Sequence, residues 1–221
     1  MTFGEIYNRV MFAVYGDTTE PESVEGIMKG SEGILSTIHR QIQEPTDWWF
    51  MEKDYPLAVS ADDGEYDLDF GNFKRERLLQ IEQSDGTLRT PLRKIEPLQA
   101  EICFLENMSA EYPIYYEIKY PLSLKLWPTP EEDCTLNIKY YGYLDRPAED
   151  LAAFNAAEDV LTIEAAYLII NLGIFEIAAP LDYVDKANTA YARAINEQYI
   201  LNRKDWSYRS KDFMTLPYRG V

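Results

Sequence analysis

Histidine and cysteine, which most often supply nucleophiles and general bases, are scarce in this sequence. The chain of 221 residues has one histidine, His39, and two cysteines, Cys103 and Cys134. A Ser–His or Cys–His pair would have to use His39, and a packing or surface histidine on a helix is the ordinary interpretation. The three side chains also fall short of a structural zinc site. No G-x-S-x-G, phosphate-binding loop or dinucleotide fingerprint is present, so we expect no enzyme activity.

Carboxylates are abundant, and one cluster of them could suggest a cation site. The stretch "ADDGEYDLDFG" supplies oxygen ligands of the kind that Ca²⁺ prefers, but without the spacing of an EF-hand. An acidic turn beside a strand is the simpler interpretation, so we expect neither a metal nor another cofactor. The acidic residues of this stretch are Asp62, Asp63, Glu65, Asp67 and Asp69.

Trp48 and Trp49 lie next to each other and could stack on a sugar ring. With a pair of carboxylates they would suit a carbohydrate-binding module or an acid–base glycosidase. A Trp-Trp pair where helices give way to strands is more often part of a core. Because 38 residues are acidic, a nearby carboxylate pair carries little specificity, and this function stays the alternative.

The C-terminal segment "NRKDWSYRSKDFMTLPYRGV" interleaves basic and aromatic side chains. Aromatic residues and arginine are preferred anchors of protein interfaces, and disordered tails are usually poor in aromatics. Stacking on nucleic acid is a further possibility. We predict that 202–221 is an extended docking arm for a partner protein. Its expected contact residues are Arg203, Lys204, Trp206, Tyr208, Arg209, Lys211, Phe213, Leu216, Tyr218 and Arg219.

The net charge of −17 contrasts with this basic segment. An acidic surface repels phosphate, so nucleic-acid binding by the whole surface is not expected. Such a surface would instead suit a channel through which DNA slides without adhering. A basic arm on an acidic body is also a charge-complementary arrangement.

The sequence predicts a protein of the cytosol that is not inserted in a membrane. The start of the chain, "MTFGEIYNRVMFAVYG", places charges inside its apolar run and does not read as a signal peptide. The uncharged stretch 165–175 is shorter than the ~20 residues that cross a bilayer. We expect both cysteines to be reduced and buried.

Hydrophobic periodicity predicts helices at both ends of the chain. The first covers 2–14, the second begins near Thr19 and runs to about residue 42, and a short one covers 97–108. A buried helix capped by Asn155 and Glu158 extends to Pro180, and a last one covers 182–201. The residues of this last helix expected to face inward are Val184, Ala187, Tyr191, Ala194 and Ile195.

Between the helices the apolar period changes to two, which is typical of strands. Leu122, Leu124 and Leu126 share one face, and Leu136, Ile138 and Tyr140 share another. The sequence therefore predicts an α+β protein with an inserted antiparallel β unit in a helical bundle. The expected division is 1–47 with 150–201 for the helical domain, 48–149 for the β-rich domain and 202–221 for the arm.

The order of these segments resembles the phage head-to-tail adaptor proteins, also called connector or tail accessory proteins. The resemblance is carried by "DWWF" at the end of the first helices, "YPLAVSADDGEYDLDF", "LSLKLWPTPEEDCTLNIKYYGYL" and the helix "LTIEAAYLIINLGIFEIA". It extends from about Phe3 to Leu201 and is one of pattern rather than of a specific motif.

The resemblance implies a virion protein of the head-tail junction, made in the host cytoplasm. Adaptors of this kind form a ring, commonly of twelve copies, beneath the portal protein. They extend the DNA channel and present a platform to the next tail or nozzle protein. Their C-terminal segments reach the portal, which is the role expected here for the arm. DNA would pass through the channel of the ring without adhering to the protein.

Overall fold

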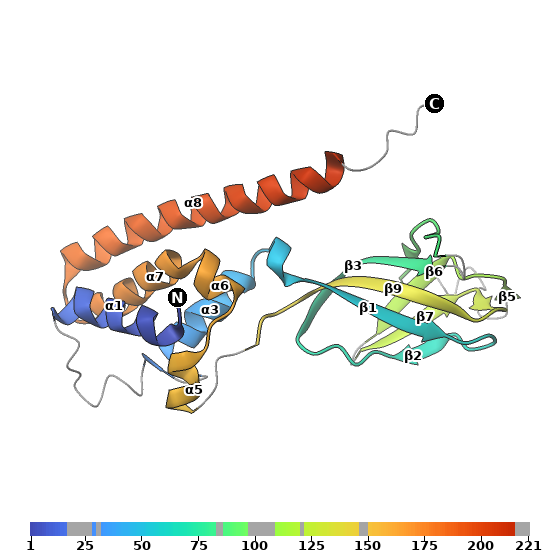
Figure 1. Ribbon diagram of the computed structural model, residues 1–221, viewed down its shortest axis with the longest axis horizontal. Helices are drawn as coiled ribbons and strands as arrows, with labels where there is room; N and C mark the ends of the chain where they lie inside the picture. Colours follow the sequence, from blue (N-terminus) through green and yellow to red (C-terminus); the bar gives the residue numbers. More distant parts are fainter. Residues whose placement is uncertain are drawn as a thin grey trace. The chain divides into compact units, whose positions relative to one another are not determined.

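A computed structural model shows the fold of the chain (Figure 1). It describes residues 1–16, 28–29, 32–82, 86–96, 109–119, 122–145 and 150–214, with the backbone alone at 109, 151 and 210–214. The predicted start of the second helix near Thr19 and the predicted helix over 97–108 lie outside these residues. The protein is α+β, with helices in one compact unit and strands in the other.

The two units divide the chain after Phe50 and before Leu144. The helical unit comprises residues 1–50 and 144–221, and the strand-rich unit comprises residues 51–143. The division expected from the sequence placed 48–149 in the strand-rich part.

The strand-rich unit contains a three-stranded antiparallel sheet with β9 (Cys134–Gly142) in its centre. β1 (Glu52–Val59) and β3 (Phe73–Glu82) pair with its two edges. The alternating apolar pattern of this region predicted buried residues correctly, because Leu136 and Ile138 are fully buried. Successive strand side chains point to opposite faces, which gives this sheet one apolar face.

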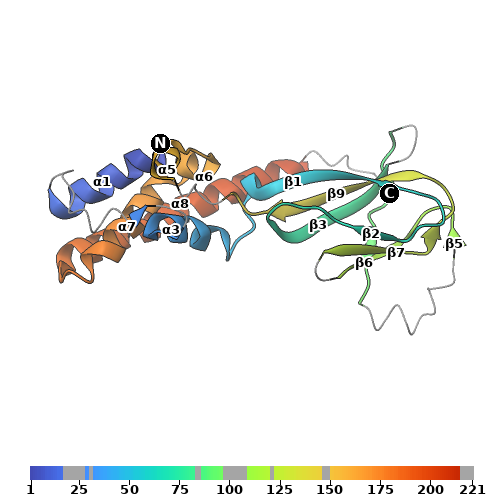
Figure 2. The same ribbon diagram turned by 90° about the horizontal axis from the view of Figure 1, so that it is seen from below.

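A second sheet covers that apolar face. Its order is β2 (Glu65–Asp67), β7 (Ser123–Trp127), β6 (Tyr115–Lys119) and β4 (Arg93–Lys94). Leu124 and Leu126 of β7 pack in one core with Leu79, Leu136 and Ile138 of the first sheet. Figure 2 shows the two sheets as separate layers.

The prediction of an antiparallel unit holds for the longer ladders and is wrong for two short ones. β4 pairs with β6 in parallel, and β5 (Ser109–Ala110) pairs in parallel with β8 (Thr129–Pro130). β4 lies at the edge of the second sheet, and β5 and β8 form a separate two-stranded sheet. Period-two alternation cannot reveal pairings this short.

In the helical unit, α7 (Ala166–Ala178) is the central element and contacts α1 (Phe3–Tyr15), α3 (Ile34–Gln43) and α8 (Val184–Met214). Gly173 lies where these helices are close together: a Cβ there would lie 3.1 Å from Val10 and 3.3 Å from Leu35, so both side chains would have to shift slightly. The first helix was predicted well. It begins with a capping box between Thr2 and Glu5.

The predicted helix from Asn155 to Pro180 is three helices: α5 (Leu151–Ala156), α6 (Val160–Glu164) and α7. The predicted capping box at Asn155 is wrong, because Asn155 lies inside α5. Asp150 caps α5, and Asp159 caps α6 through a capping box with Thr162. A short 3₁₀ turn, η1 (Trp49–Met51), ends the first helical segment.

The last helix is longer than expected. α8 extends to Met214 and runs alongside α7 (Figure 1), so the prediction of an extended arm from residue 202 is wrong for 202–214. Polar and aromatic residues after Leu201 hid the continuation, although arginine and lysine are good helix formers. Residues 215–221 of the predicted arm lie outside the described part of the chain.

Candidate functional site

His39 is a structural histidine. The residue is 1% exposed, and Nε2 lies 2.7 Å from the Asp159 carboxylate. Gln43 Oε1 accepts a hydrogen bond from the backbone N–H of Leu144, so the Gln43 amide nitrogen faces His39 Nδ1 at 3.2 Å. Nδ1 therefore accepts, and Nε2–H donates to Asp159. Both ring nitrogens are engaged, which leaves neither free to act as a general base.

Asp159 joins α3 to the start of α6. Burial alone would raise the pKa of its carboxyl group, but the hydrogen bond and electrostatic interaction with His39, together with hydrogen bonds from the Thr162 and Leu161 backbone, outweigh burial and lower that pKa below its ordinary value. The contact therefore stabilises the ionised carboxylate at neutral pH.

Cys134 offers no better nucleophile. It is a free, half-buried cysteine, and burial, reinforced by Asp133, raises the pKa of its thiol despite the opposing charge of Arg89. A raised pKa reduces the thiolate that attacks. The prediction of a buried reduced cysteine is thus met in part here, and Cys103 lies outside the described residues.

The acidic cluster is a turn, and the described residues contain no group of acidic, histidine or cysteine side chains that could hold a metal ion. Asp63 caps the turn by accepting a hydrogen bond from the Glu65 N–H. The hydroxyl of Tyr66 donates to the Asp63 carbonyl at 2.8 Å. These contacts explain the cluster as local turn chemistry.

Trp48 and Trp49 do not form a sugar-binding platform. Trp48 is fully buried and donates from its indole nitrogen to the Ile42 carbonyl at 2.8 Å. Trp49 stacks on Tyr208 with ring centroids 6.0 Å apart, and its backbone N–H donates to Asp205. Trp49, the first residue of η1, thus contacts the second half of α8.

Three of the expected arm residues make contacts within the helical unit. Lys204 pairs with Glu164 at 3.0 Å. Arg209 pairs with Asp205 at 2.8 Å and also donates to the Asp47 carbonyl. Together with the Trp49–Tyr208 stack, these contacts hold the second half of α8 against its own unit.

Arg203 and Trp206 point away from that unit. Both are exposed, and 74% of the Trp206 surface is accessible. Lys211 and Phe213 lie in the last turn of α8, where only the backbone is described. Leu216, Tyr218 and Arg219 lie outside the described residues.

Three alanines, one leucine and one aspartate form the buried face of α8, and large apolar side chains are exposed on the rest of the helix. Tyr191, Ile195 and Tyr199 are 50%, 56% and 62% exposed. We call these three residues the α8 stripe, because residues four apart share one face of a helix. Among the residues of this helix whose side chains the structure describes (184–209), the buried ones are Ala187, Ala190, Ala194, Leu201 and Asp205.

The sequence prediction was right for Ala187 and Ala194, which face inward, and wrong for Val184, Tyr191 and Ile195. Alanine lets α8 approach α7 closely, and that approach leaves no space for a larger ring on the same face. Tyr191 therefore lies at the edge of the contact, with its ring centroid 5.2 Å from that of Phe175.

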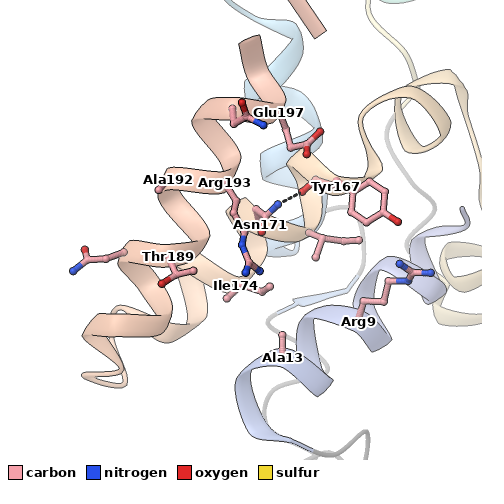
Figure 3. A pocket seen from close by; sticks show the side chains of 12 residues that line it. Arg9, Ala13, Tyr167, Asn171, Ile174, Thr189, Ala192, Arg193 and Glu197 are labelled. Carbon is pink, nitrogen blue, oxygen red and sulfur yellow. Dashed lines mark hydrogen bonds between the residues drawn. The ribbon is translucent and has the colours of Figure 1, made fainter. Parts of the chain in front are cut away.

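A groove lies between α1, α7 and α8 and has a volume of about 840 Å³ (Figure 3). We call it the α1–α7–α8 groove. Ile170 and Ile174 contribute apolar surface, while Arg9 and Arg193 bring two guanidinium groups to it. Arg9 lies over the ring of Tyr167, 5.9 Å from its centroid. Sequence patterns did not indicate this groove, because its residues come from three separate helices.

Comparisons with known proteins add no family assignment: no protein-family model matches the sequence, and no curated protein matches it significantly. Within the described part of the chain, no helix combines the length and hydropathy that crossing a lipid bilayer requires. The candidate site therefore rests on geometry alone: the exposed end of α8, the α8 stripe and the neighbouring groove.

Proposed function

We propose that this chain is a structural phage protein, a head-to-tail adaptor that forms a ring beneath the portal and joins the capsid to the tail. The observation that carries the proposal is the exposed end of α8, where Arg203 and Trp206 project from a helix anchored to its own unit. An arginine beside an exposed tryptophan is typical of the residues that dominate interface energetics.

The anchoring of α8 supports a docking role. A partner that binds a preformed helix does not bear the entropy of ordering that segment, which strengthens binding. In this proposal the helices of one copy form a bundle, the end of α8 meets the portal, and the strand-rich unit contacts the next tail or nozzle protein.

The net charge of −17 supports passage of DNA through such a ring without adhesion. Assembly is the whole mechanism in this proposal, and no catalysis or cofactor is invoked. The protein would belong to the virion, at the head-tail junction, after synthesis in the host cytoplasm. The structure does not support the sugar-binding alternative, because Trp48 is buried and its ring is not accessible to a sugar.

The test is binding to purified portal rings encoded in the same genome, measured by native mass spectrometry and titration. Trp206→Ala should weaken binding by about 2 kcal/mol or more, roughly 30-fold in Kd. The matched control is Tyr183→Ala, which removes another exposed aromatic ring of the helical unit. Wild-type chain that leaves the portal unbound would contradict the proposed function.

Residues 215–221 need a separate variant. A truncation after Leu201 would remove the contacts of Asp205 and Tyr208 with Trp49 and so disturb the helical unit itself. A truncation after Met214 keeps all of α8. If this shorter truncation weakens portal binding, the last seven residues contribute to docking. Unchanged binding would confine docking to α8.

A further inference from the structure

We propose that a hollow between the segments 88–93 and 110–114 of the strand-rich unit binds a segment of a partner protein in which an apolar side chain lies beside a carboxylate. The hollow has a volume of about 740 Å³, and we call it the Leu88–Ile114 hollow. The inference rests on the proposed function, which gives the strand-rich unit a tail or nozzle protein as its partner but names no surface. It adds the surface and the chemistry that the surface recognises.

The exposed apolar side chains of the strand-rich unit gather at this hollow. Among the described residues of the unit, Leu88 and Ile114 are the large apolar side chains that are exposed, by 50% and 53%. Both line the hollow, although they come from two separate segments. Pro91 and Pro113 line it as well and add apolar surface without a backbone N–H. Apolar side chains that gather in one exposed place mark interaction sites, whereas scattered ones do not.

Backbone hydrogen bonds hold the two segments in place. The Arg89 N–H donates to the Ile81 carbonyl at 2.9 Å, and the Arg93 N–H donates to the Ile114 carbonyl at 2.9 Å. The Ile114 N–H in turn donates to the Trp127 carbonyl at 2.8 Å. The hollow is therefore shaped before a partner arrives, so binding does not bear the cost of ordering these segments.

The charges of the hollow favour a carboxylate. Arg89 lies 3.7 Å from the ring centroid of Tyr112 and pairs with Glu111 at 3.3 Å. Arg93 is exposed, and its side chain forms no ion pair or hydrogen bond with any residue that the structure describes. The charges of Arg89 and Glu111 cancel, so the charge of Arg93 remains. A guanidinium group binds a carboxylate through two parallel hydrogen bonds, which makes an acidic side chain the matching group on the partner.

The surroundings of the hollow disfavour a polyanion. Glu111 lines the hollow, and the hydroxyl of Tyr112, another lining residue, donates to the Glu132 carboxylate at 3.3 Å. DNA would bring several phosphates close to these carboxylates of a chain with a net charge of −17, and the repulsion opposes binding. A carboxylate beside an apolar side chain satisfies both Arg93 and the apolar walls. We therefore assign the hollow to a protein segment.

The chemistry is tested by methyl NMR of the full chain with two short synthetic peptides. The peptides share a pair of leucines and differ only in the next residue, which is glutamate or glutamine. Both should shift the methyl signals of Leu88 and Ile114, and the glutamate peptide should bind roughly three- to fivefold more tightly. The net charge of −17 would by itself favour the glutamine peptide, so a preference for glutamate must come from a local cation.

Substitutions of Arg93 identify that cation. Arg93→Gln should abolish the preference for glutamate, and Arg93→Glu should bind a lysine version of the peptide more tightly than the glutamate version. Methyl signals that do not shift, equal affinities for the first two peptides, or a preference that survives Arg93→Gln would overturn the inference. A short DNA duplex that shifts these methyl signals in place of the glutamate peptide would overturn it as well.

The partner is tested by calorimetric titration with the purified tail or nozzle protein encoded in the same genome. Ile114→Ser and Leu88→Ser should each weaken binding by about tenfold or more, with an unchanged circular dichroism spectrum. The matched control is Ile163→Ser, because Ile163 is 57% exposed against 53% for Ile114 and lies on α6 of the helical unit. An equal loss in the control would contradict the inference.

The outcomes separate this inference from the proposed function. If the wild-type chain binds portal rings and the tail protein, and both hollow variants bind the tail protein as tightly as wild type, the inference fails and the adaptor role stands. If the glutamate peptide binds with the expected dependence on Arg93 but the chain binds neither portal rings nor the tail protein, the hollow keeps its assigned chemistry and the adaptor role fails.

Discussion

The two units of the molecule treat their apolar side chains differently. The strand-rich unit buries them between two sheets, and among the described residues it exposes only Leu88 and Ile114 of its large hydrophobic side chains. The helical unit exposes many more, including Phe12, Tyr167 and the α8 stripe. The strand-rich unit has a completed core, whereas the helical unit presents surfaces of the kind that partners cover.

Charges follow the same division. Cross-strand ion pairs cover the outer faces of the strand-rich unit, such as Glu65 with Lys125 and Asp54 with Lys139. On α8, by contrast, Lys204 pairs with Glu164 of α6, Arg209 pairs with Asp205 of the same helix, and the stripe stays exposed. The helical unit therefore leaves large apolar side chains exposed, whereas the strand-rich unit covers its outer faces with paired charges.

In the helical unit, we expect substitution of Trp48 to cause the largest loss of unfolding free energy. Comparing it with Trp206 tests the contrast between a buried and an exposed aromatic ring. Trp48→Ala removes a fully buried side chain and its hydrogen bond to Ile42, so it should cost about 3–5 kcal/mol of unfolding free energy. Trp206→Ala should change that free energy by less than about 0.5 kcal/mol. Urea unfolding followed by circular dichroism checks both, and equal losses would refute the assignment of Trp206 to an exposed surface.

In the strand-rich unit, the matching test is Leu79. It is fully buried and packs with Leu124 and Ile138 between the two sheets, so Leu79→Ala should cost about 2–5 kcal/mol. The exposed Leu88 provides the control, because Leu88→Ala removes the same atoms from the surface. Hydrogen exchange should show the loss of protection confined to residues 51–143, and loss of protection throughout the chain would show that the units unfold together.

Acid should weaken the helical unit through Asp159. Because the pKa of this carboxyl is lower in the folded chain than its ordinary value of 3.8, the unfolded chain binds more protons in acid. Its stabilising contribution is therefore present above about pH 4 and is lost as the pH falls through the folded pKa.

The substitution Asp159→Asn removes the pH dependence that this carboxyl group gives to the stability of the helical unit. It replaces a charged acceptor of the His39 hydrogen bond and should cost about 1.5–3 kcal/mol at neutral pH, while the difference from wild type shrinks in acid. Urea titrations at a series of pH values measure the trend. A difference that stays constant down to about pH 2 would contradict the lowered pKa.

The sequence was most informative where burial is one-sided and regular. The alternation at Leu136 and Ile138 and the helical period from Phe3 to Met11 both predicted buried residues correctly. In these elements one apolar face meets one core, so the sequence pattern contains nearly all the information that positions the side chains.

The pattern failed where a helix meets a neighbour through small residues. On α8 the hydrophobic pattern predicts that Tyr191 and Ile195 face inward, but alanines occupy most of that face. Hydrophobicity alone cannot distinguish a residue that faces the core from an exposed apolar residue, because both are apolar. The groove beside α8 depends on the tertiary arrangement of three helices, which no local pattern contains.

The smallest effect is expected at the surface ion pairs of the strand-rich unit. Glu65 of β2 and Lys125 of β7 are 3.2 Å apart across two paired strands, and the Glu65 side chain is largely exposed. A double-mutant cycle at these two positions should give a coupling of about 0.2–1 kcal/mol that decreases as salt is added.

The weakness of this coupling is what the comparison of the two units requires. If this ion pair contributed strongly to the free energy of unfolding, the surface charges of the sheets would stabilise the fold as the buried Leu79 does. A weak, salt-sensitive coupling means instead that the charges keep an already complete unit hydrated. Substitutions in the exposed α8 stripe should likewise change the free energy of unfolding little. A coupling of several kcal/mol, unaffected by salt, would remove this distinction.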